Sequence, residues 1–177
     1  MKRLLQALIL AAALSTGRAA APTRHVSLPL GSVAPAISLA KIDGQMVSSN
    51  TWNGKTVVLN FWAFWCDTWK AELPDLEDLT TKQDELHFKL IAISVDATRQ
   101  TALATTSPDG APFPILLDAR GSVSDNYKIS SVPTVVVVDP SGRVRYTASG
   151  YPGNQPLLSI LRIIDSESRT KTPKGGR

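Results

Sequence analysis

A strand that runs directly into a helix, with the only cysteine of the chain at the junction, constrains this sequence most. Residues 57–62 form an apolar run interrupted only by Asn60, which is typical of a central strand covered on both faces. A helix is predicted from Cys66 to about Gln83. It contains Pro74, which removes one backbone hydrogen bond and should kink the helix. Cys66 is therefore expected to open a helix at the end of a central strand.

Strands and helices alternate along the rest of the chain. Residues 37–48 alternate in polarity and turn at Asp43-Gly44, which is a strong hairpin signal. Further strands are predicted at residues 88–95, 134–139 and 143–148, and further helices at residues 98–106, 122–127 and 157–165. This order predicts a single α/β domain with three layers.

The N-terminus has the layout of a secretory signal peptide. Lys2 and Arg3 precede a short apolar run and a small-residue zone that extends to Ala21. The apolar run is shorter than the ~20 residues that a spanning helix needs, although an uncleaved membrane anchor is the alternative. We expect four regions: a signal peptide at 1–21, a connecting arm at 22–33, one folded domain at 34–165 and a basic flexible tail at 166–177. Export would place the protein in the periplasm or another extracytoplasmic compartment.

The net charge of +4 comes from the two ends of the chain. Between residues 22 and 168 there are 12 basic and 15 acidic side chains, so the body carries a charge of −3. No basic face with interleaved aromatic residues is evident, and nucleic acid is not an expected partner.

The position of Cys66 indicates thiol chemistry. The helix dipole and the free backbone N–H groups at a helix start favour a thiolate, whereas the adjacent carboxylate of Asp67 disfavours a second negative charge. A lone cysteine forms no intramolecular disulfide, and in an exported protein it indicates a reactive thiol or pairing with another molecule. A buried, inert thiol is the alternative interpretation.

The segment from Phe61 to Pro74 resembles the active-site signature of extracytoplasmic thioredoxin-like proteins of the TlpA/ResA type, F-W-A-x-W-C-x-x-C-x-x-E-x-P. Every fixed position is met except the second cysteine, where this chain has Trp69. The likeness covers about residues 31–165, and its other motifs are Ala34-Pro35, Asp43-Gly44, residues 91–96, residues 113–118 and residues 127–134. The resemblance implies a thioredoxin-like three-layer α/β/α sandwich with a central mixed sheet.

The resemblance also implies a set of site residues around Cys66, the expected nucleophile. In this family a cis X-Pro bond lies opposite the cysteine, which implies that Val132, Pro133 and Thr134 bind an extended substrate strand through the backbone. Trp65 and Trp69 would line the site, although Trp69 is equally well explained as a core residue. Glu72 would manage a proton near the thiol, or it is a surface glutamate of the helix.

The missing second cysteine implies a monothiol site. Cys66 would form mixed disulfides with protein or small-molecule thiols, and an external reductant would be needed for turnover. A binding module that has lost redox turnover is one alternative. A one-Cys thiol peroxidase is another, although such sites usually carry a threonine where this chain has Ala63.

No cofactor or metal is expected. His25, His87 and Met46 make no ligand set with Cys66 that spacing supports. Contact with a membrane is expected only through an uncleaved signal.

Overall fold

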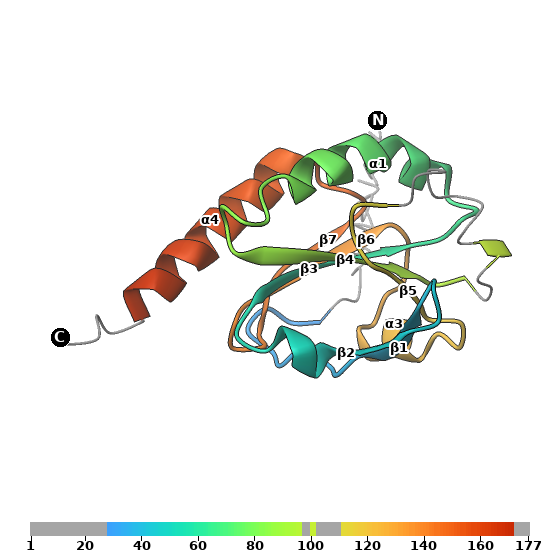
Figure 1. The fold of residues 1–177 in the computed structure, drawn as a ribbon, viewed down its shortest axis with the longest axis horizontal. Helices are drawn as coiled ribbons and strands as arrows, with labels where there is room; N and C mark the ends of the chain where they lie inside the picture. The colour runs from blue at the N-terminus through green and yellow to red at the C-terminus, as the bar shows by residue number, and fades with distance from the viewer. Residues whose placement is uncertain (1–27, 97–99, 102–110, 172–177) are drawn as a thin grey trace, which may run out of the picture.

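The computed structural model describes residues 28–96, 100–101 and 111–171. Its centre is one mixed sheet of seven strands, in the order β2-β1-β5-β4-β3-β6-β7 (Figure 1). The strands are β1 (Ser38–Lys41), β2 (Met46–Ser48), β3 (Thr56–Trp62), β4 (Phe88–Ser94), β5 (Ile115–Leu117), β6 (Thr134–Val138) and β7 (Val144–Ser149). Strands β3, β4 and β5 are parallel, whereas β6 runs antiparallel to β3.

Helices cover both faces of the sheet. The described helices are α1 (Asp67–Thr80), α3 (Ser122–Asn126), α4 (Asn154–Lys171) and the 3₁₀ helix η1 (Ser49–Trp52). Figure 1 shows α1 and α4 on one side of the sheet and α3 and η1 on the other. The three-layer α/β/α arrangement predicted from the sequence is confirmed. The helix predicted at residues 98–106 lies largely outside the described residues.

Strand β3 is the centre of the molecule, because all seven of its residues are buried and it pairs with a strand on each side. Its side chains alternate between the two faces, as the strand period requires. Val58 and Trp62 join the core under α1 and α4. Leu59 and Phe61 join the second core, under α3 and η1.

The hairpin predicted at Asp43-Gly44 is present. Strands β1 and β2 pair antiparallel, and Gly44 adopts a φ of 91° in the connecting turn. This is a left-handed backbone conformation that glycine adopts without a steric penalty. The short strand β5 is not among the strands predicted from the sequence. It pairs antiparallel with β1 and parallel with β4.

The predicted C-terminal ends of the two long helices are wrong. Helix α4 continues to Lys171, so residues 166–171 are helical rather than part of a flexible tail. Glu167 in this stretch accepts hydrogen bonds from Arg145 of β7 at 2.8 and 3.1 Å, which ties the helix end to the sheet. Helix α1 ends at Thr80, before the predicted Gln83.

The predicted arm at 22–33 also contributes to the fold where it is described. The backbone N–H of Gly31 donates to the carbonyl of Val144 at 2.7 Å, and Val33 forms a bridge with Arg143. The proposed signal peptide at 1–21 lies outside the described residues. Within them, no helix combines the length and the apolar character needed to span a membrane.

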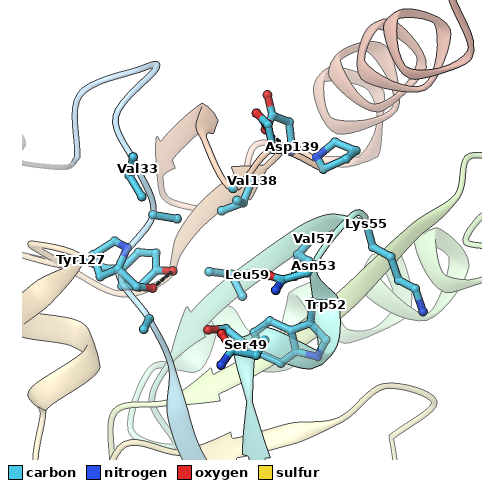
Figure 2. A pocket seen from close by; sticks show the side chains of 17 residues that line it. Val33, Ser49, Trp52, Asn53, Lys55, Val57, Leu59, Tyr127, Val138 and Asp139 are labelled. Carbon is cyan, nitrogen blue, oxygen red and sulfur yellow. Dashed lines mark hydrogen bonds between the residues drawn. The ribbon is translucent and has the colours of Figure 1, made fainter. Parts of the chain in front are cut away.

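A hollow of about 410 Å³ opens on the α3 side of the sheet. Figure 2 shows Trp52 and Ser49 on one side of it, Val138 and Asp139 on the other, and Tyr127 at one end. None of its lining residues comes from the β3–α1 junction or from residues 131–134. This hollow is therefore separate from the region around Cys66.

Candidate active site

Cys66 lies at the junction of β3 and α1, where the sequence predicted it. It is the N-cap residue of α1, and its side chain is partly exposed. The connection from β3 to α1 is short. It is anchored to the segment that follows β4, because the backbone N–H of Phe64 donates a hydrogen bond to the carboxylate of Asp96. A fully buried strand therefore leads directly to the helix start that places the sulfur at the surface.

Among the described residues, the sulfur of Cys66 has two hydrogen-bonding neighbours. Its Sγ lies 2.9 Å from Oγ1 of Thr68, on the first turn of α1, and 3.7 Å from the carbonyl oxygen of Val132. The sulfur makes no capping hydrogen bond to the first backbone N–H groups of α1. The contact with Thr68 was not predicted from the sequence. Residues two apart in a helix do not normally face each other, so sequence spacing gave no reason to pair Thr68 with Cys66.

The Val132–Pro133 peptide bond is cis, as predicted, and this loop faces Cys66. The pairing of β3 with β6 places it there, since Phe61 lies opposite Thr134 in the register. Thr134 is buried, and its hydroxyl donates to the carbonyl of Ser131 at 2.6 Å. Its side chain therefore holds the loop in place.

The two aromatic residues that come directly before Cys66 in the chain are exposed. Trp65 has a relative exposure of 62 % and Phe64 one of 41 %. Large apolar side chains exposed side by side are typical of a surface that contacts a partner. Trp65 was predicted as a wall of the site, whereas Phe64 was missed because the family pattern leaves its position variable.

Trp69 is a core residue and does not wall an exposed site. Its side chain is fully buried and stacks on Trp62, with ring centroids 4.2 Å apart and planes 13° apart. The ring of Phe113 meets it edge-on at 6.4 Å. Because residue i+3 from Cys66 faces the sheet, the position of the missing second cysteine is filled by packed aromatic rings. The structure supports the core interpretation of Trp69 over the substrate-shelf interpretation.

Glu72 is buried beneath α1 rather than on the helix surface. Burial raises its pKa to about 7, and the neighbouring amide of Asn60 favours the ionised form and offsets this only in part. In the described part of the chain, five buried side-chain atoms lack hydrogen-bond partners: both amide atoms of Asn60, Nε1 of Trp62, Nε1 of Trp69 and Oε2 of Glu72. All five belong to β3 or α1, so a polar region lies within the core on the α1 side of the sheet.

No metal site is visible in residues 28–96, 100–101 and 111–171, since no three His, Cys, Asp or Glu side chains cluster there as a ligand set.

The fold and this site define a thioredoxin-like protein. The family model described as the AhpC/TSA family matches residues 30–147, and the chain belongs to that family. The thioredoxin domain of a thiol-disulfide oxidoreductase from Bacteroides vulgatus superposes with a TM-score of 0.69 at 26 % identity, covering 78 % of this chain and 99 % of that one.

Similar proteins include thiol-disulfide oxidoreductases named ResA. The chain is 34 % identical to ResA of Oceanobacillus iheyensis over 125 residues, which is 68 % of this chain and 65 % of that protein. It is 29 % identical to ResA of Bacillus subtilis over 138 residues, which is 78 % of this chain and 77 % of that protein.

We predict that Glu72 makes the protein less stable as the pH rises toward 7. Below about pH 4.5 the Glu72 carboxyl is protonated in the folded and in the unfolded protein. Above that pH it ionises in the unfolded chain, whereas the folded protein keeps the proton until about pH 7. The folded state therefore loses about 2 kcal/mol of stability across this window, after allowance for partial solvent screening. Glu72→Gln should remove this loss, as measured by urea unfolding at pH 4.5 and pH 8.

Glu77→Gln, on the exposed face of the same helix, is the matched control for removal of a charge. If Glu72→Gln loses as much stability between pH 4.5 and pH 8 as the unmodified protein, Glu72 does not titrate in this window.

Proposed function

We propose that this protein is an exported thiol-disulfide exchange protein with a monothiol site. The observation that carries the proposal is the geometry at Cys66, a partly exposed thiol at a helix start that faces the Val132–Pro133 loop. The similarity to proteins named thiol-disulfide oxidoreductases supports it.

In the proposed reaction the Cys66 thiolate attacks one sulfur of a disulfide R–S–S–R′. The Cys66–S–S–R bond forms, and the bond between the two substrate sulfurs breaks. R′S⁻ leaves with the bonding electron pair and takes a proton from solvent. An external thiol then attacks the mixed disulfide, which frees Cys66 and releases R as the disulfide of that thiol. No second thiol of the chain can carry out this step, because Cys66 is the only cysteine.

The proposed partner is a protein or small molecule with an accessible disulfide or thiol. An extended segment would pair with the backbone at Val132, which lies beside the sulfur. The exposed rings of Trp65 and Phe64 would contact apolar groups next to the reacting sulfur. The carbonyl of Pro133 already accepts from the N–H of Gly150 at 2.8 Å, so pairing would involve Val132 rather than Pro133.

A binding module without turnover is the second candidate. The full burial of Trp69 favours the binding module, because the helix position that would carry a second thiol to release a bound partner is part of the core. The two candidates differ in whether Cys66 reacts with disulfides, and in whether a second thiol on α1 produces turnover.

We propose export through a signal peptide at residues 1–21, because charged, apolar and small residues follow one another there in the order of such a signal. We predict that the mature protein begins near Ala20 or Pro22 and is recovered from the periplasmic or secreted fraction. Mass analysis of the N-terminus is the measurement. A soluble cytoplasmic protein that retains Met1 would disprove export.

We predict that folded protein incubated with oxidised glutathione acquires a single glutathione, on Cys66. The reaction should be faster than with the same protein in denaturant, because the folded site presents the sulfur at a helix start. The product should persist until excess dithiothreitol is added. Intact-mass spectrometry follows both steps, and Cys66→Ser, which should acquire no glutathione, is the control. Equal or slower reaction in the folded state would favour the binding-module candidate.

We predict that Trp69→Cys creates a dithiol site, because residues i and i+3 lie on the same face of a helix. The variant should form an internal disulfide and reduce insulin with turnover when a reductant is supplied. Loss of the buried indole should cost about 3–5 kcal/mol of stability. Trp69→Ser is the matched control, since it loses the same packing and gains no thiol. A folded Trp69→Cys protein with two free thiols and no turnover would favour the binding module.

A further inference from the structure

The two polar neighbours of the Cys66 sulfur differ in what they can do. The carbonyl of Val132, 3.7 Å away, only accepts hydrogen bonds, so it pairs with the protonated thiol. The hydroxyl of Thr68, 2.9 Å away, also donates. A thiolate has no proton and only accepts, so of these two neighbours Thr68 alone can stabilise the ionised sulfur.

The other donors near the helix start do not reach the sulfur. Cys66 makes no side-chain hydrogen bond to the first amides of α1. The indole N–H of Trp69 is buried and makes no hydrogen bond. Within the described residues, the Thr68 hydroxyl has no hydrogen-bond partner other than this sulfur. The hydroxyl is therefore available as a donor, and no other donor among the described residues forms a hydrogen bond with the sulfur.

We propose that Thr68 is a catalytic residue of this site, whose hydroxyl donates a hydrogen bond to the Cys66 thiolate before it attacks a disulfide. The proposal rests on the proposed thiol-disulfide exchange at Cys66. Thr68 keeps its proton throughout, because the leaving thiolate is protonated by solvent. When the thiol ionises, its hydrogen bond to Val132 is lost, which leaves that carbonyl available to a strand docked at the loop.

The test compares Thr68→Val, which keeps the shape of the side chain without the hydroxyl, with Thr68→Ser, which keeps the hydroxyl. Alkylation of the folded proteins by iodoacetamide is measured from pH 5 to pH 10, because only the thiolate reacts. These variants retain the titratable groups on the segments around the site: Asp67, Lys70 and Glu72 of α1, Asp96 after β4, and Tyr151 before α4.

The contact between Thr68 and the sulfur is exposed, so water replaces part of a lost hydrogen bond, and the thiolate fraction should fall about three- to tenfold at low pH. Thr68→Val should therefore react about three- to tenfold more slowly below pH 7, and match or exceed the unmodified protein where the sulfur is fully ionised. Thr68→Ser should stay within about twofold of the unmodified protein at every pH.

Three results would overturn the proposal: a Thr68→Val profile equal to that of the unmodified protein, a loss of the same size at every pH, or a Thr68→Ser protein that behaves like Thr68→Val. If Thr68→Val does not fold, Thr68→Ala is judged by the same profile. Iodoacetamide contains no disulfide, so this assay tests Thr68 independently of the proposed function. The reaction of unmodified protein with oxidised glutathione tests the function itself.

Discussion

The pairing of β3 with β6 is the constraint on which the rest of the site depends. Strand β3 is buried along its whole length, and β6 runs antiparallel to it with Phe61 opposite Thr134. This register places the start of β6 beside the end of β3, so the Val132–Pro133 loop meets Cys66. A slip of one residue would turn every β6 side chain to the other face of the sheet. It would also shift the Val132–Pro133 loop along β3, away from its place beside Cys66.

Much of the fold was predictable from local patterns. The apolar run before Cys66 identified β3, and Asp43-Gly44 identified the first hairpin, because both are set by nearby residues. The ends of helices were less predictable. Helix α4 extends beyond the predicted Asp165 because Glu167 pairs with Arg145, a contact between segments far apart in the chain. Strand β5 depends on its two neighbours in the same way.

The candidate site was predictable where a family pattern covers it and less so elsewhere. The position of Cys66 and the cis bond before Pro133 follow the family pattern, and the structure has both. The side chain of Trp69 was ambiguous, because helical spacing does not say whether the inner face of a first turn reaches solvent. The structure assigns it to the core through its stack on Trp62. The contact between Thr68 and the sulfur depends on side-chain geometry that no sequence pattern records.

The aromatic stack under the helix start also bears on how long a captured partner stays attached, if Cys66 exchanges disulfides as proposed. A second thiol on the same helix would free a partner in a first-order step that is independent of the surroundings. With Trp69 packed on Trp62 in that position, release is second-order and needs a thiol from solution. The residence time of a partner then varies inversely with the thiol concentration of the compartment. The protein would act as a covalent clamp whose dwell time reports how reducing its surroundings are.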